Sequence, residues 1–207
     1  MTDLTLYSMP SSGNSYKARL LLALLDLPYT HIGMEYETAE LAEAHAKGRL
    51  PMGKLPVLML KDGTAIPESN AILYYLAQGT AWLPDDPVAR AHTLGWMFWE
   101  QNQHEGVIAV RAALRTYKSR AHLATPARMA ELLDAGHALL LHMETHLKER
   151  AWLVGASPTI ADISLYAYTH TAGSKGGFEI ERFPSVQRWL DRVAALPGYV
   201  ALDDIPE

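Results

Sequence analysis

The stretch LPVLMLKDGTAIPESNAILYYLA, residues 55–77, decides the fold because two strands, a tight turn and a helix follow one another in it without interruption. The apolar run LPVLML and the run TAIPE flank the turn signal KDG, which is typical of an antiparallel β-hairpin. The following ESNAILYYLA has apolar residues at the spacing of a helix. This stretch therefore predicts an antiparallel pair of strands that leads directly into a helix.

The residues before this stretch alternate between strand and helix. We expect strands at residues 4–8 and 29–34, and helices at residues 16–25 and 38–47. A right-handed crossover would join the first two strands, and the hairpin would add the antiparallel pair. The order βαβαββα thus predicts a four-stranded mixed sheet with helices on both faces, which is a thioredoxin-like α/β domain.

After the connector GTAWLPDDP the pattern becomes entirely helical. We expect long helical segments at residues 88–118, 126–149, 158–172 and 184–195. Thr159 and Asp162 fit a capping box at the start of the third segment, where Ser157 is an alternative cap. The glycine-rich GSKGGFEIERF is expected to be a mobile surface loop. These patterns predict an α/β domain of residues 1–79 and an all-helical domain of residues 87–207.

The composition excludes several classes of function. Hydrophobic residues make up 49% of the 207 positions, enough for a sizeable core, and the net charge is −5 at pH 7. The 18 lysines and arginines are spread along the chain, so nucleic acid is not expected as a partner. The sequence has no apolar run of about 18 residues and no basic leader before an apolar run, so we expect no membrane span, no signal peptide and a cytoplasmic location.

The chain contains no cysteine. Disulfides, thiolate metal sites and a thiol nucleophile of the protein itself are therefore excluded, and any sulfur chemistry must arrive with a substrate. His142 and His146 have a spacing at which two imidazoles can share a metal ion. Their flanks have the pattern of an amphipathic helix with a solvated face, so no metal site is expected.

Three stretches together resemble the cytosolic glutathione transferase superfamily, in its bacterial members with a serine-type, zeta- or tau-like motif. They are SSGNSYKARLLLALLDLPY, LPMGKLPVLMLKDGTAIPESNAILYYLA and LVGASPTIADISLYAY. The resemblance spans essentially the whole chain and is carried by their order and spacing. It implies a cytoplasmic homodimer that uses glutathione as a co-substrate, without a metal, and conjugates it to a small hydrophobic electrophile, a detoxification activity of the glutathione S-transferase type.

The segment LYSMPSSGNSYKAR aligns without gaps with the serine-type pattern, in which the catalytic serine lies seven residues before a helix arginine, here Arg19. By this resemblance Ser12 is the catalytic residue. Ser11 and Asn14 remain alternatives, because some bacterial members use an asparagine or threonine near this turn. Tyr7 lies close to the position of the tyrosine-type classes but one residue away from their spacing.

The groups of this turn can supply the free energy that is needed to lower the pKa of a thiol. An unperturbed thiol has a pKa of about 8.5, and lowering it by about two units takes roughly 2.7 kcal/mol. A hydroxyl that donates to a charged acceptor contributes about 1.5 to 3 kcal/mol, and a helix N-terminus about 0.3 to 1 kcal/mol. One serine and one helix start therefore suffice. The alternative is that the polar residues form only a turn and a helix cap.

The resemblance assigns the rest of the glutathione site by position. Pro56 would be cis, which would leave the backbone of Leu55 to pair with the cysteinyl part of the peptide. Ser69 and the helix start would bind the γ-glutamyl carboxylate, and Glu68 the ammonium group. Lys54 would meet the glycine carboxylate. A strand-edge proline, an ordinary helix cap and a solvated lysine are the alternatives.

The electrophile pocket is expected between the domains, bounded by the turn after the first strand and by the helix WMFWEQNQHEGVIAVR. Met9, Trp99, His104 and Arg111 are the candidate residues, with Trp96 beside them. Aromatic residues on a long helix are also typical of a core.

Two other functions remain open. Bound glutathione could reduce disulfides or isomerise an unsaturated acid, as in the zeta class. Gly13 and Asn14 replace the second serine and the cysteine of the zeta motif, which disfavours the isomerase. The chain could also be a non-catalytic binding or assembly module, although such a module would not need the candidate ligand site.

Overall fold

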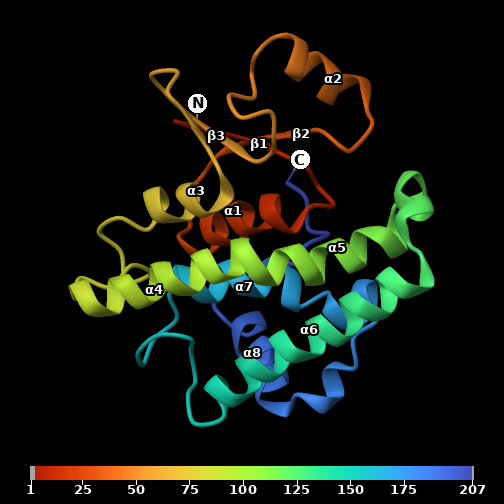
Figure 1. Ribbon diagram of the computed structural model, residues 1–207. Helices are drawn as coiled ribbons and strands as arrows, with labels where there is room; N and C mark the ends of the chain where they lie inside the picture. The colour runs from red at the N-terminus through yellow and green to blue at the C-terminus, as the bar shows by residue number, and fades with distance from the viewer. Residues whose placement is uncertain (1–2, 207) are drawn as a thin grey trace. The chain divides into compact units, whose positions relative to one another are not determined.

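The computed structural model describes residues 3–206, and the chain divides into two compact units (Figure 1). The first unit holds the residues up to Thr80 together with those from Ala194 onward, and the second holds Ala81–Val193. The helical domain expected from the sequence continued to residue 207, whereas the residues after Val193 group with the first unit.

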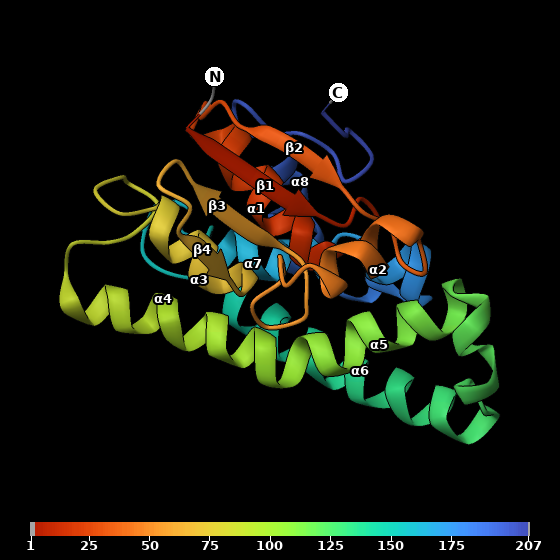
Figure 2. The same ribbon diagram turned by 90° about the horizontal axis from the view of Figure 1, so that it is seen from above.

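The first unit has the predicted order βαβαββα. Its elements are β1 (Leu4–Ser8), α1 (Gly13–Leu24), β2 (Thr30–Gly33), α2 (Ala39–Ala46), β3 (Val57–Leu60), β4 (Ala65–Pro67) and α3 (Ser69–Leu76). The strands lie in the order β2-β1-β3-β4 (Figure 2), with β1 parallel to β2 and antiparallel to β3. The predicted thioredoxin-like domain with a four-stranded mixed sheet is confirmed.

Successive side chains of β1 point to opposite faces of the sheet. Leu6 and Ser8 are fully buried on one face, the face covered by α1 and α3 (Figure 1). Tyr7 points to the other face and packs against the cluster that includes Ala44 of α2 and Val57 of β3. The sheet therefore has a helix layer on each face, as the sequence pattern predicts.

The C-terminal tail is tied to α1 by two hydrogen bonds. The Tyr16 hydroxyl donates to the carbonyl of Val200 at 2.7 Å, and Arg19 Nη2 donates to the carbonyl of Leu202 at 3.0 Å. Both side chains lie on the buried side of α1, so the tail completes the first unit. No local pattern in the tail signals this contact.

The second unit is entirely helical, as predicted. Its elements are α4 (Pro87–Trp99), the π-helix η1 (Glu100–His104), α5 (Glu105–Thr116), the 3-10 helix η2 (Lys118–Leu123), α6 (Pro126–Leu147), α7 (Ile160–Thr169), the π-helix η3 (Ala172–Gly176), the 3-10 helix η4 (Ile180–Arg182) and α8 (Pro184–Ala194). In residues 3–206, no helix combines the length and apolar character that a membrane crossing requires.

The start of α7 is held by the predicted capping box. The Thr159 hydroxyl accepts from the backbone N–H of Ala161, and Asp162 accepts from the backbone N–H of Thr159 at 2.8 Å. Asp162 is fully buried and also accepts from the N–H of Leu153 at 3.0 Å and from Nε1 of Trp189 at 2.9 Å. Burial raises the pKa of Asp162, against the opposing effect of these donors. This carboxyl group thus joins three separate segments of the second unit.

The segment 173–183 is not a surface loop along its whole length, contrary to the expectation from its glycines. It includes most of η3 and all of η4, and Phe178 is only 3% exposed. The Phe178 ring lies against Gly136 in the middle of α6, where an added Cβ atom would come within 2.1 Å of the ring. An aromatic anchor that fits over a helix glycine is a tertiary contact, which the local composition does not signal.

We expect Gly136→Ala to lower the free energy of unfolding by about 1 to 3 kcal/mol, the usual cost of overpacking. The cost arises although alanine has the higher helix propensity, by about 1 kcal/mol. Gly106→Ala in α5 is the matched control, because an added Cβ atom there has no neighbour within 4 Å. Denaturant unfolding of both variants checks this, and equal stability of the two would contradict the packing account. When Phe178→Leu is combined with Gly136→Ala, the smaller side chain should leave room for the added methyl group and restore part of the lost stability.

Candidate functional site

The turn between β1 and α1 presents one hydroxyl group that the fold does not use. Ser12 is the N-cap of α1 and has an extended backbone, with φ −85° and ψ 129°, but its side chain makes no capping hydrogen bond. The side chain is half-buried, and within residues 3–206 its hydroxyl has no hydrogen-bond partner. This hydroxyl is therefore available to a ligand at the start of α1.

The backbone of the turn is held by side chains from α1. The Met9 N–H donates to Ser15 Oγ at 2.9 Å. Arg19, which is 1% exposed, donates to the carbonyls of Met9 and Pro10 at 3.4 and 3.0 Å and to Ser8 Oγ at 2.9 Å. Burial lowers the pKa of Arg19. The helix arginine that marked the serine-type pattern thus binds two carbonyls of the turn and contributes to its shape.

Ser11 differs from Ser12 because its hydroxyl is already engaged. Ser11 Oγ donates to Glu35 Oε1 at 2.7 Å, and the Ser11 N–H donates to Glu35 Oε2 at 3.1 Å. Sequence reasoning missed Glu35. It follows the carboxyl end of β2, which lies beside the carboxyl end of β1 in a parallel pair, so its position after the strand was the available signal.

Asn14 connects α1 with α3. Ser69 Oγ donates to Asn14 Oδ1 at 3.1 Å, and Ser69 is only 3% exposed. This bond joins the first turns of the two helices. Glu68, the N-cap of α3, is exposed and has a φ of 69°, a left-handed backbone that is uncommon for a residue other than glycine. Such outliers are frequent at ligand sites.

The sheet register brings the three predicted segments to one end of the sheet. Tyr7 pairs with Val57, and Val57 pairs with Pro67. Met9 follows Tyr7 by two residues, Leu55 precedes Val57 by two, and Ser69 follows Pro67 by two. The parts of the chain that the resemblance assigns to the thiol, the cysteinyl backbone and the γ-glutamyl group thus begin at the same end of the sheet.

The peptide bond between Leu55 and Pro56 is cis, as the resemblance implied. In residues 3–206, neither the N–H nor the C=O of Leu55 has a hydrogen-bond partner. Both groups are open to the backbone of an extended peptide, which can pair with them through main-chain hydrogen bonds. Lys54 is exposed and makes no ion pair with the described residues.

Two candidates of the second unit lie in its interior. His104 is fully buried, and its Nε2 lies 3.0 Å from Thr169 Oγ1. Because Thr169 donates its own proton to the carbonyl of Leu165, His104 is the donor in this pair. Arg111 is 7% exposed, donates to the carbonyl of Met129 at 2.6 Å and lies over the Phe178 ring.

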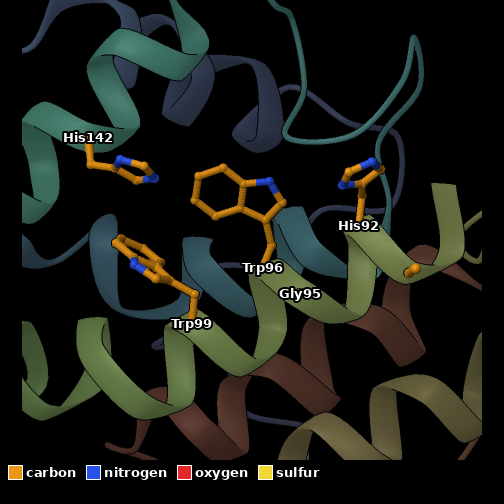
Figure 3. A pocket seen from close by; sticks show the side chains of 6 residues that line it. His92, Gly95, Trp96, Trp99 and His142 are labelled. Carbon is orange, nitrogen blue, oxygen red and sulfur yellow. The ribbon is translucent and has the colours of Figure 1, made fainter. Parts of the chain in front are cut away.

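Trp99, the third candidate, lines a different feature. A cavity of about 250 Å³ opens on the second unit (Figure 3), lined by Ala91, His92, Gly95, Trp96, Trp99 and His142. The rings of Trp96 and Trp99 are 5.4 Å apart and perpendicular. The structure therefore brings Trp96 and Trp99 together, but His104 and Arg111 do not line this cavity.

His142 and His146 pack their rings against Trp96, at 5.6 and 4.8 Å between centroids. His146 Nε2 lies 2.8 Å from the carbonyl of Leu153, which its N–H satisfies. Both imidazole rings are thus packed against Trp96, and that of His146 is also hydrogen-bonded. Residues 3–206 contain no group of three histidine, aspartate or glutamate side chains that could hold a metal ion.

We expect His146 to make the protein sensitive to acid. Burial lowers the pKa of His146 below its ordinary 6.5, aided by Arg150 and His142 and opposed by the bond to Leu153. The neutral ring is thus favoured in the folded state, so its contribution to stability is complete above about pH 6.5 and is lost as the pH falls through the folded pKa. The melting temperature of His146→Gln should fall less than that of the wild type between pH 7.5 and 5.5. Parallel curves would contradict this.

Comparisons with known proteins agree on one family. Models described as "Glutathione S-transferase, N-terminal domain" and "Glutathione S-transferase, C-terminal domain" match residues 6–81 and 108–197. The structure of a glutathione S-transferase from Xanthobacter autotrophicus Py2 is 42% identical, covers 96% of each chain and has a TM-score of 0.88.

Two further relatives bear on the ligand. A glutathione transferase family member from Pseudomonas fluorescens Pf-5, whose structure has two glutathione molecules bound, is 26% identical over 98% of this chain and 93% of its own, with a TM-score of 0.86. A disulfide-bond oxidoreductase from Escherichia coli strain K12 is 25% identical over 93% of this chain and 91% of its own length.

Proposed function

Because the chain belongs to the glutathione S-transferase family, we propose that it binds glutathione in the first unit and transfers it to small hydrophobic electrophiles. The observation that carries the proposal is the meeting of three segments at one end of the sheet, where the Ser12 hydroxyl and the backbone of Leu55 are open. A hydroxyl donor, an open stretch of backbone and a helix N-terminus are the groups that a γ-glutamyl peptide with a thiol requires.

The proposed pose follows the order of the peptide. The γ-glutamyl carboxylate meets Ser69 and the first N–H groups of α3, and its ammonium group meets Glu68. The cysteinyl N–H and C=O pair with Leu55, and the thiol lies at Ser12. The glycine carboxylate reaches Lys54, which is exposed at the end of the same loop.

In the proposed reaction, the thiol first releases its proton to water, and Ser12 donates a hydrogen bond to the resulting thiolate. The sulfur then attacks an electrophilic carbon and forms a C–S bond with one of its electron pairs. A halide leaves with the electron pair of the bond that breaks, or an activated alkene takes up a proton on its other carbon. The rate comes from the thiolate population and from proximity.

Two measurements test this proposal. Titration calorimetry of the wild type with glutathione should give saturable binding, and conjugation of glutathione to 1-chloro-2,4-dinitrobenzene should exceed the uncatalysed rate. Binding without conjugation of this or any other haloaromatic or unsaturated electrophile would contradict the transferase. Absence of binding would leave the non-catalytic module as the better description.

A second candidate function is glutathione-dependent disulfide reduction. The similarity to a disulfide-bond oxidoreductase favours it, and the lack of cysteine in this chain means that both thiols would come from glutathione. The first thiolate attacks one sulfur of the disulfide and expels the other as a thiolate. The thiolate of a second glutathione attacks the glutathionyl sulfur of the mixed disulfide, which expels the remaining substrate sulfur as a thiolate and yields oxidised glutathione. Turnover of bis(2-hydroxyethyl) disulfide, coupled to glutathione reductase and NADPH, separates this activity from conjugation.

We also propose a homodimer that acts in the cytoplasm in detoxification, as expected from the resemblance. Val88, Phe98 and Leu141 of the second unit expose 64%, 70% and 57% of their surface, a set of large apolar side chains that a partner copy would cover. Light scattering after gel filtration should give about twice the chain mass of 22.9 kDa. A mass of one chain would contradict the dimer.

A further inference from the structure

The turn that carries Ser12 is held from two sides by side chains of opposite chemistry. The Arg19 guanidinium, which can only donate, forms hydrogen bonds to the carbonyls of Met9 and Pro10. The Glu35 carboxylate, which when ionised can only accept, accepts hydrogen bonds from the N–H and the hydroxyl of Ser11. We infer that Glu35 is a positioning residue for thiol activation, acting through Ser11 on the orientation of the Ser12 hydroxyl. This inference rests on the proposed function.

The geometry requires a carboxylate at this position. Each Glu35 oxygen accepts from a different donor of Ser11, at 2.7 Å from the hydroxyl and 3.1 Å from the N–H. A glutamine offers one acceptor oxygen and one donor group, so in either orientation its N–H group would face a backbone N–H, that of Ser11 or that of Tyr36. Glu35→Gln is therefore a nearly isosteric change that breaks one half of the contact.

Glu35 is itself anchored on the sheet. The backbone N–H of Met34 donates to the carbonyl of Ser8 at 2.8 Å, and the Thr38 hydroxyl donates to the Glu35 carbonyl at 2.9 Å. The Glu35 side chain is half-buried and also accepts from the N–H of Tyr36 at 2.9 Å. The end of β2 thus fixes the carboxylate, and the carboxylate fixes the residue that precedes Ser12.

The contact also separates the roles of the two serines. A serine hydroxyl has a single proton, and that of Ser11 is directed to Glu35. Ser11 therefore does not compete with Ser12 as the donor to a thiolate. With the N–H and the hydroxyl of Ser11 both held, the peptide that leads into Ser12 has one orientation, and α1 begins at the next residue.

Positioning and plain electrostatics predict opposite results for Glu35→Gln. A carboxylate near a thiolate repels it, so removing the charge alone would lower the pKa of the bound thiol. If Glu35 acts by holding the turn, its loss misaligns the Ser12 donor, and the thiol pKa rises. The sign of the change therefore distinguishes the two effects.

The experiment is a pH titration of the ultraviolet thiolate absorbance of bound glutathione, together with KM and kcat for conjugation. In Glu35→Gln we expect a rise of the thiol pKa by about one unit, which is about a tenfold lower ratio of thiolate to thiol at a fixed pH below that pKa. The KM for glutathione should change less than kcat. Glu37→Gln, an exposed carboxylate two residues away, removes the same charge and should leave all three quantities as in the wild type.

Two further variants keep the inference testable if Glu35→Gln folds poorly. Ser11→Ala keeps the N–H contact and loses the hydroxyl contact, so its thiol pKa should rise by a smaller amount. Glu35→Asp keeps two acceptor oxygens, so its thiol pKa should lie closer to the wild-type value than that of Glu35→Gln. A thiol pKa that is unchanged or lowered in both Glu35→Gln and Ser11→Ala overturns the positioning role, even if the melting temperature falls. A wild type without a lowered thiol pKa overturns the proposed function instead.

Discussion

Ser12→Ala should raise the pKa of the bound glutathione thiol by about one to two units, because the hydroxyl donates to a charged acceptor and such a bond is worth about 1.5 to 3 kcal/mol. The thiolate fraction at pH 6.5 would fall about five- to fiftyfold, because about half of the wild-type thiol is expected to be ionised at that pH. The value of kcat for conjugation should fall by the same factor at that pH, and the loss should shrink as the pH approaches the thiol pKa of the variant. Steady-state kinetics from pH 6 to 9 measure this.

Ser12→Thr is the matched control for this prediction. Threonine keeps the hydroxyl at the N-cap of α1, so most of the activity should remain. If Ser12→Ala leaves the thiol pKa and the rate unchanged, the activating donor is elsewhere in the turn. Asn14 and Tyr7 would then be the residues to replace, because the hydroxyl of Ser11 is directed to Glu35.

Asp162→Ala should lower the free energy of unfolding of the second unit by about 3 kcal/mol or more, because three buried donors lose their acceptor. The carboxyl group accepts from the backbone N–H groups of Leu153 and Thr159 and from Trp189 Nε1. Each buried donor that loses its acceptor costs about 1 to 3 kcal/mol. Denaturant unfolding, followed by tryptophan fluorescence, measures the change.

Asp134→Ala is the control for this prediction, because Asp134 lies exposed on α6. That variant should stay within about 0.5 kcal/mol of the wild type. The free energy of unfolding of Asp162→Asn should lie between those of Asp162→Ala and Asp134→Ala, since an amide keeps one acceptor oxygen. A loss below about 1 kcal/mol in Asp162→Ala, on the scale of a single average hydrogen bond, would contradict the role of this carboxyl group as the junction of three segments.

The features that the sequence predicted correctly are local ones. The hairpin of residues 55–68 has its turn chemistry and apolar runs within a few residues, and the box of Thr159 and Asp162 spans a single helical turn. The long helices followed from their apolar period. In each case the residues that specify the element lie inside it, so a single sequence contains the information.

The features that the sequence did not predict depend on contacts between distant residues. Glu35 meets Ser11 across 24 positions, and the carbonyl of Leu202 meets Arg19 across 183. The ring of Phe178 covers Gly136 on another helix. Such pairings depend on tertiary packing, which local patterns do not encode.

The candidate site divides in the same way. Ser12, Leu55 and Ser69 were placed by position, and the sheet register brings their segments to one end of the sheet. His104 and Arg111 were chosen as polar residues on a long helix, where the side of the helix decides whether a group is exposed. The structure places both in the interior of the second unit, where Thr169 and Met129 bind them.

The most direct test of the account is the thiol pKa of glutathione bound to the wild-type protein, from the ultraviolet thiolate absorbance against pH. Ser12 and the start of α1 together predict a pKa about two units below the value of about 8.5 for a free thiol. A bound thiol that titrates near about 8.5, or no bound thiolate at any pH, would contradict thiol activation at this turn.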